Sequence, residues 1–242
     1  MAQPGMDAGP ANRAHLTILS RAPEPGRSKT RLAAAIGNDA AARLAEAFLL
    51  DISEALRGSA NWSTTLFVEP ASAVDRMRRL TGINEVQAQS AGSIGARMAA
   101  AVGSSISAGA DSVIVVGSDI PTLGPETVQA ALTALRENDV VFGPARDGGY
   151  YLMGLGPEPL TTSRYAALFN DAAVHWSTAT VLAESEAIAR DQGFSSARLT
   201  GALDVDTAAD LASLREELAV LPDTRAAHTR AALQALDGDG LT

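Results

Sequence analysis

Apolar positions recur at two spacings along the chain, and their alternation predicts a fold of the α/β class. Short apolar runs that end in polar loops are typical of strands. The run 112–116 is β-branched at nearly every position, as expected for a strand buried on both faces. Apolar side chains at four-residue spacing predict helices, as in the segment that starts at Asn38 or Asp39 and stops at Gly58. The expected strands are 15–20, 64–68, 85–89, 112–116, 139–142, 150–155 and 197–199, and the other expected helices are 71–80, 93–109, 125–135, 178–192 and a final pair after residue 206.

Strands and helices alternate as far as residue 155, which predicts a mostly parallel sheet with right-handed crossovers and helices on both faces. In such sheets ligands bind at the carboxyl ends of the strands. Each unusual loop of this chain follows an expected strand, so we expect these loops to form one site. They are 21–31, 89–97, 117–123 and 143–149.

Length and composition narrow the class of protein. A chain of 242 residues predicts one domain, which we expect to span 15–236 between loose tails at 1–14 and 237–242. The absence of cysteine excludes disulfides and thiolate zinc sites, and the three histidines are far apart in sequence. A net charge of −9 argues against nucleic-acid binding. No apolar run approaches the length of a membrane span and residues 1–14 do not resemble a signal peptide, so we expect a cytoplasmic protein.

The loop after the first strand is basic in an otherwise acidic chain. Arg21, Arg27, Lys29 and Arg31 lie within eleven positions, and Lys29 is the only lysine of the sequence. A basic loop between a strand and a helix favours phosphate binding, with Gly26 among the phosphate-binding residues and Lys29 as an exposed point charge. The alternative is a solvated charged loop. The segment is neither a Walker A loop nor a GxGxxG turn.

Two acidic segments are candidate metal ligands. Asp119 follows the most apolar strand, beside Ser118, and we expect both at the carboxyl edge of the sheet with Ser118 near the nucleotide. Asp204 and Asp206 precede a late helix, where Thr207 and Asp210 make a capping-box variant that leaves Asp206 free. Carboxylates together with substrate phosphates are the usual magnesium ligands. The alternative for both segments is helix capping.

Three further positions are candidate substrate contacts. The turn Asp147-Gly148-Gly149 lets backbone approach a ligand and carries Asp147 toward it, and a hairpin turn at the same place is compatible with that role. Arg97 lies in the first turn of a helix and is a candidate anion or ribose contact; a surface arginine is the alternative. Trp176 is a candidate pocket wall, although a core position is favoured.

Five stretches, in order along residues 15–218, resemble a known bacterial family. They are 25–32 (PGRSKTRL), 95–98 (GARM), 117–121 (GSDIP), 143–152 (GPARDGGYYL) and 204–207 (DVDT) with Asp210-Leu211. Together they resemble the domain of unknown function 2064 family, also described as arsenosugar-biosynthesis-type glycosyltransferases. Its relatives include phospholactate guanylyltransferases and molybdopterin-cofactor nucleotidyltransferases.

The resemblance implies a GT-A-like nucleotide-diphospho-sugar transferase fold, with a mixed, mostly parallel sheet between helix layers. It also implies roles for particular residues. Asp119 resembles the metal-binding aspartate of that fold and Asp206 its second carboxylate, while Lys29 and Arg31 resemble phosphate-binding residues. Position 120 is often cysteine in the family and is Ile120 here, which argues against a thiol role.

We therefore expect a transferase that depends on Mg²⁺ or Mn²⁺ and takes a nucleotide sugar or a nucleoside triphosphate as donor. Lys29 and Asp147 are the expected catalytic residues, Asp147 as the base or as the group that orients the acceptor. Glycosyl transfer to a small molecule is favoured, because nucleotidyl transfer to a phosphorylated acceptor needs a second basic pocket and no second basic cluster is evident. A guanylyltransferase-like nucleotidyltransferase that acts on a phosphorylated small molecule is the first alternative. A non-catalytic nucleotide-binding protein is the second.

Overall fold

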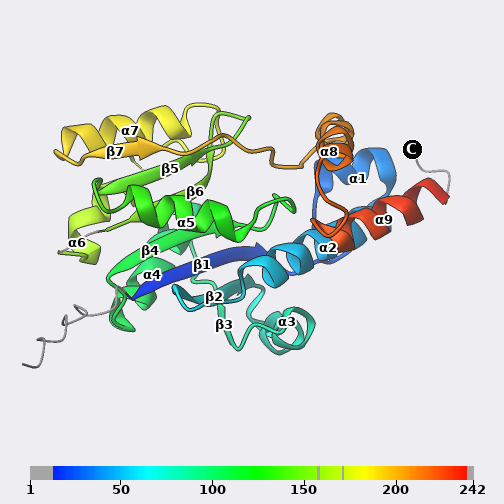
Figure 1. Ribbon diagram of the computed structural model, residues 1–242, viewed down its shortest axis with the longest axis horizontal. Coiled ribbons are helices and arrows are strands. Elements are labelled where there is room, and N and C mark those ends of the chain that lie inside the picture. The colour runs from blue at the N-terminus through cyan, green and yellow to red at the C-terminus, as the bar shows by residue number, and fades with distance from the viewer. Residues whose placement is uncertain (1–12, 157–158, 171, 239–242) are drawn as a thin grey trace, which may run out of the picture.

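The computed structural model describes residues 13–156, 159–170 and 172–238. Its centre is a seven-stranded sheet in the order β3-β2-β1-β4-β6-β5-β7, with helices on both faces (Figure 1). The strands are β1 (Ala14–Arg21), β2 (Trp62–Glu69), β3 (Glu85–Ala88), β4 (Ser112–Gly117), β5 (Val140–Pro144), β6 (Tyr150–Leu155) and β7 (Ser196–Arg198). The helices are α1 (Thr30–Ile36), α2 (Asn38–Leu56), α3 (Val74–Thr81), α4 (Ile94–Ser107), α5 (Pro125–Ala134), α6 (Thr162–Tyr165), α7 (Val181–Asp191), α8 (Ala208–Val220) and α9 (Ala227–Gly238), with 3-10 turns η1 (Ala71–Ala73) and η2 (Ala166–Phe169).

The sheet is mixed and mostly parallel, as expected. β1 lies parallel to both β2 and β4, β2 parallel to β3, and β5 parallel to β7, whereas β6 runs antiparallel to both of its neighbours. Each expected strand is present with ends that shift by at most two residues. The carboxyl ends of β1, β2, β3 and β4 therefore meet at one edge, where the sequence predicts a site.

Three local expectations differ from the structure. The stretch 21–31 is not a loop throughout, because helix α1 begins at Thr30; its proline and arginine content conceals the helix start. The N-terminal tail predicted at 1–14 lies outside the described residues except for Arg13 and Ala14, and Ala14 already belongs to β1. The C-terminal tail predicted from residue 237 starts inside α9, and 239–242 lie outside the described residues.

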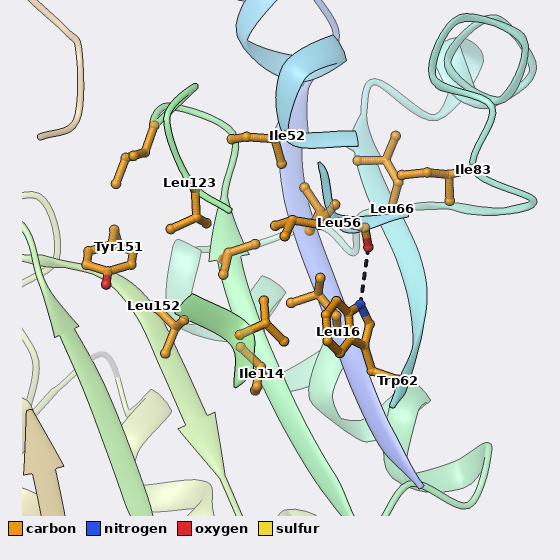
Figure 2. Close-up of a cluster of buried hydrophobic side chains, with 14 of the residues drawn as sticks. Leu16, Ile52, Leu56, Trp62, Leu66, Ile83, Ile114, Leu123, Tyr151 and Leu152 are labelled. Carbon is orange, nitrogen blue, oxygen red and sulfur yellow. Dashed lines mark hydrogen bonds between the residues drawn. The ribbon is translucent and has the colours of Figure 1, made fainter. Parts of the chain in front are cut away.

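Alternate residues of β4 face opposite layers, which explains why this strand is apolar throughout. Ile114 and Val116 belong to a cluster with side chains of α2, α3 and α5, and Val113 and Val115 belong to another with α4, η2 and α7. Figure 2 shows the first cluster, in which Trp62 Nε1 donates to the carbonyl of Leu56 at 3.3 Å. No helix in the described part of the chain is long and apolar enough to cross a membrane.

A third cluster joins the two ends of the sequence. Leu32 and Ile36 of α1 and Phe48 of α2 pack against Leu203 and Val205, together with apolar residues of α8 and α9. Because the basic loop precedes α1 and the aspartates 204 and 206 flank Val205, this packing brings the two predicted site segments together.

Asp51 of α2 anchors the start of α9 from a buried position. Its carboxylate accepts hydrogen bonds from the backbone N–H of His228 at 2.9 Å and from the backbone N–H and hydroxyl of Thr229 at 2.8 and 2.5 Å. The first turn of a helix has backbone N–H groups without partners in the helix, and a carboxylate there also interacts favourably with the helix dipole. Asp51 therefore ties α9 to α2.

We predict that Asp51→Ala lowers the free energy of unfolding by about 2–4 kcal/mol, because bonds to a buried charge contribute more than neutral ones and three donors lose their acceptor. Urea unfolding at pH 7 measures the loss. Glu54→Ala is the control, since Glu54 of the same helix pairs with His228 at the surface (3.1 Å) and such pairs contribute little. Equal losses for the two variants would contradict the anchor.

Candidate functional site

A cavity of about 330 Å³ lies at the carboxyl edge of β1, β2, β3 and β4. Five of its lining side chains are positively charged, so we call it the basic cavity. They are Arg21, Arg27, Lys29, Arg31 and Arg97. Ser118 and two carboxylates, Asp119 and Asp206, line the same space. Most of the predicted phosphate and metal residues therefore meet in one place.

Lys29 lies between the two predicted metal ligands. Its Nζ is 2.6 Å from Oδ1 of Asp119 and 2.9 Å from Oδ1 of Asp206, and it stands 5.6 Å from the centre of the Phe48 ring. Only 5 % of its side chain is exposed, so the expectation of an exposed loop lysine is wrong. Burial alone would lower the pKa of Lys29, but the charges of the two aspartates outweigh it and raise the pKa. Lys29 is therefore buried and charged, and it pairs with carboxylates from two segments that are distant in the sequence.

The turn before Lys29 has a tight backbone. Ser28 is buried; its hydroxyl donates to the carbonyl of Ala22 at 3.2 Å and accepts from the backbone N–H of Glu24 at 3.0 Å. Gly26 has a φ of +75°, which favours glycine, and does not line the cavity. Lys29 itself is left-handed at φ 46°, immediately before α1. Gly26 and Ser28 thus shape the loop that aims Lys29 inward.

Asp119 and Asp206 provide carboxylate oxygens, which are suitable ligands for a divalent cation. Their side chains are 50 and 42 % exposed, and the backbone N–H of Val205 donates to the carbonyl of Asp119, which links the two segments. The predicted capping box of Thr207 and Asp210 is present. Among the described residues no three acidic or histidine side chains form a metal-binding group. Two carboxylates completed by substrate phosphates remain a suitable oxygen donor set for Mg²⁺ or Mn²⁺.

Asp204 lines a second, smaller cavity and does not line the basic one. This cavity of about 140 Å³ is lined by Asp119, Asp147, Asp204 and the two tyrosines at the start of β6, and we call it the acidic cavity. Burial, followed by the charges of Asp147 and Asp206, raises the pKa of Asp204 to about 6. Asp119 lines both cavities, so they adjoin at this residue.

The glycine turn forms the hairpin between β5 and β6, as expected. The backbone N–H of Gly149 donates to Oδ1 of Asp147 at 2.8 Å, and both residues line the acidic cavity. Gly148 has a φ of +90°, and a Cβ there would lie 2.1 Å from the carbonyl oxygen of Ala179. The structure therefore gives Gly148 a packing role and does not place it in the lining. Trp176 is partly buried against the apolar cluster around α7 and lies outside both linings.

The far end of the basic cavity contains residues that the sequence analysis missed. Glu69 ends β2 and Gln89 follows β3, and both lie beside Arg97, whose Nη1 pairs with the carboxylate of Glu69. Their signal was available, because each lies where a strand ends at the predicted edge. Neither belongs to a charged run or a glycine turn, which is why they did not stand out.

Comparison with known proteins places the chain among the uncharacterized proteins conserved in bacteria that form the DUF2064 family, whose profile matches residues 49–178. The chain belongs to this family. A protein from Desulfovibrio desulfuricans G20, assigned as a nucleotide-diphospho-sugar transferase, is 30 % identical with a TM-score of 0.84, over 94 % of this chain and 96 % of that one. This relative confirms the expected GT-A-like fold.

More distant similarities follow the same pattern. A cytidylyltransferase from Leptospira borgpetersenii serovar Hardjo-bovis shares the fold alone, at 12 % identity and a TM-score of 0.56 over 94 % of this chain and 95 % of its own. A 3-phospho-D-glycerate guanylyltransferase from Phenylobacterium zucineum is 30 % identical over 132 residues. That match spans 53 % of this chain and 61 % of the relative. These relatives are transferases, as the resemblance implied.

We predict that Lys29→Ala lowers the free energy of unfolding by about 1–3 kcal/mol, because it leaves Asp119 and Asp206 close together without a cation; water around the half-exposed carboxylates limits the loss. Thermal and urea unfolding measure it. Lys29→Arg should cost nearly as much, since the larger guanidinium does not fit the buried position. Arg27→Ala, an exposed change in the same loop, should cost little. Equal stability of all three variants would show that the lysine is not a structural centre.

Proposed function

We propose that this protein is a metal-dependent transferase that uses a nucleotide-activated donor, and that it is a glycosyltransferase acting on a small-molecule acceptor. The observation that carries the proposal is the meeting of the basic and acidic cavities at Asp119. A donor with phosphates suits the first cavity, an acceptor suits the second, and the reacting bond would lie between them.

On the donor side, the arginines at 21, 27 and 31 and the ammonium of Lys29 offset the charge of a diphosphate. Asp119 and Asp206 are the residues that would hold Mg²⁺ or Mn²⁺. A divalent ion bound there would neutralise the negative charge that develops on the leaving diphosphate. Lys29 pairs with both carboxylates and lines the same cavity, so its ammonium would attract a phosphate that binds beside them.

On the acceptor side, Asp147 faces a cavity next to Asp119. A hydroxyl of the acceptor attacks the anomeric carbon of the sugar, the bond from that carbon to the diphosphate oxygen breaks, and Asp147 takes the hydroxyl proton. The backbone N–H of Gly149 holds one oxygen of Asp147 in place, at 2.8 Å. The products are the glycosylated acceptor and a nucleoside diphosphate.

The charge of the acidic cavity favours glycosyl over nucleotidyl transfer. Its described lining contains three aspartates and no lysine, arginine or histidine, so a phosphorylated acceptor finds no cationic side chain there. Nucleotidyl transfer remains the second candidate, supported by the similarity to a guanylyltransferase. In that reaction the acceptor phosphate attacks the α-phosphorus of a nucleoside triphosphate and pyrophosphate leaves.

A substrate panel tests the reaction. The protein is incubated with Mg²⁺ or Mn²⁺, a mixed small-molecule extract, and either nucleotide sugars or nucleoside triphosphates, and products are followed by mass spectrometry. We expect a glycosylated product and a nucleoside diphosphate from one nucleotide sugar. Pyrophosphate release from a triphosphate would instead support the nucleotidyltransferase. Nucleotide binding without any product would favour a non-catalytic binding protein.

A separate test addresses the metal ligand. We predict that Asp119→Asn keeps the fold and weakens Mn²⁺-dependent nucleotide binding at least tenfold, about 1.4 kcal/mol, because the amide lacks the charge that binds the ion. Calorimetry with and without Mn²⁺ measures the effect. Asp75→Asn, on an exposed surface of α3, is the matched control. An unchanged metal-dependent affinity in Asp119→Asn would remove Asp119 from the metal site.

A further inference from the structure

We propose that the ammonium of Lys29 and a divalent cation compete for the same two carboxylate oxygens, so that the ion binds well only together with phosphates. This proposal rests on the proposed function, because it takes Asp119 and Asp206 as the metal ligands. It adds an exchange at that site. The lysine holds the two carboxylates until a phosphate offers it another partner, and the ion then takes its place.

The ammonium of Lys29 bridges the two carboxylates. Its Nζ is 2.6 Å from Oδ1 of Asp119 and 2.9 Å from Oδ1 of Asp206, and among the described residues it pairs with no other carboxylate. Mg²⁺ lies about 2.1 Å from the oxygens that bind it, so an ion on these two oxygens would lie within about 5 Å of Nζ. The two cations repel each other at that distance. One pair of oxygens therefore does not serve both.

The burial of Lys29 opposes the binding of a divalent ion alone. The side chain is only 5 % exposed, and Nζ stands 5.6 Å from the centre of the Phe48 ring. A buried ammonium that loses its carboxylates is not compensated by water, as an exposed one would be. The ion must therefore either overcome the repulsion of Lys29 or leave it without a partner. We expect a low affinity for the ion alone.

Phosphates remove this cost. Arg21, Arg31 and Lys29 line the same cavity, so a diphosphate that pairs with the arginines brings its oxygens near the ammonium. The ammonium has three N–H donors on a flexible stem and can turn from a carboxylate to a phosphate. The phosphates also give the ion the oxygen ligands that two carboxylates do not supply. The ion and the nucleotide therefore strengthen each other's binding, by the same factor in both directions.

The two carboxylates stay close together when the lysine turns away. The backbone N–H of Val205 donates to the carbonyl of Asp119 at 3.1 Å, and the backbone N–H of Asp206 donates to Oδ2 of Asp210 at 3.1 Å. These bonds hold both segments without using Lys29. The carboxylates are about half exposed whereas Lys29 is buried, so an ion can reach them from the solvent side.

Lys29 is the only lysine of the sequence, so its exchange can be followed in the unmodified protein. Protein labelled with ¹³C,¹⁵N-lysine gives one lysine side-chain signal by NMR, and calorimetry shows what has bound. We expect millimolar Mg²⁺ alone to leave this signal nearly unchanged, and Mg²⁺ with pyrophosphate to move it. An unmoved signal in the complex with Mg²⁺ and pyrophosphate would overturn the exchange, because Lys29 would still hold the carboxylates.

Lys29→Met tests the competition without any phosphate, since methionine keeps an unbranched stem and lacks the charge. Calorimetry and thermal unfolding with Mn²⁺ alone measure the affinity. We expect the variant to bind Mn²⁺ at least about tenfold more tightly than the parent and to gain more in Tm from the ion. Arg79→Ala, which removes one charge from an exposed position of α3, should bind Mn²⁺ as the parent does. Adding Asp119→Asn to Lys29→Met should abolish the gain.

The remaining outcomes separate the exchange from the proposed function. Equal Mn²⁺ affinity of the parent and a folded Lys29→Met would overturn the competition and leave the metal-dependent transferase intact. If Lys29→Met did not fold, the NMR titration of the parent would decide by itself. If the parent bound Mn²⁺ neither alone nor with pyrophosphate or any nucleotide, the proposed metal dependence would fail, and the exchange with it.

Discussion

The ion triplet of Lys29, Asp119 and Asp206 is the interaction on which the site depends. A lysine that is 95 % withdrawn from solvent would lose its charge if it stood alone, and two aspartates this close would repel each other. The charges of the two carboxylates raise the pKa of Lys29 against the effect of its burial. The three residues come from the basic loop, the end of β4 and the segment before α8, so the site forms only when the sheet and the cluster of α1, α2, α8 and α9 have both assembled.

The packing behind this triplet explains why the late segment belongs to the domain. Leu203 and Val205 are buried with Leu32 and Phe48, and the backbone of Val205 bonds to that of Asp119. The side chains of Asp204 and Asp206 alternate with these buried residues. Asp206 lines the basic cavity and Asp204 lines the acidic one. One short segment thus supplies a carboxylate to each side of the proposed reaction.

Sequence periodicity was sufficient to predict the strands, most of the helices and the edge of the sheet at which the loops gather. One reason is that the apolar residues of β4 and its neighbours predict that these strands are buried. Another is that the helix starts at Ser93, Pro125 and Thr207 have local capping signals. The burial of Lys29 could not be predicted, since it depends on partners 90 and 177 positions away. Glu69 was within reach of the strand-end rule and was missed because it stands alone.

The distribution of charge makes the basic cavity attractive to anions. The chain carries a net charge of −9, yet five cations line one space at the strand ends. Field lines concentrate in such a cleft, and a polyanion is drawn to it from an otherwise repelling surface. The carboxylates at both ends of the cavity oppose that attraction unless a cation or a donor group faces them. Asp119 and Asp206 meet this condition through Lys29, and Glu69 meets it through Arg97. Because each pair couples a carboxylate to a basic side chain, no carboxylate of the described lining of this cavity faces it without a cation.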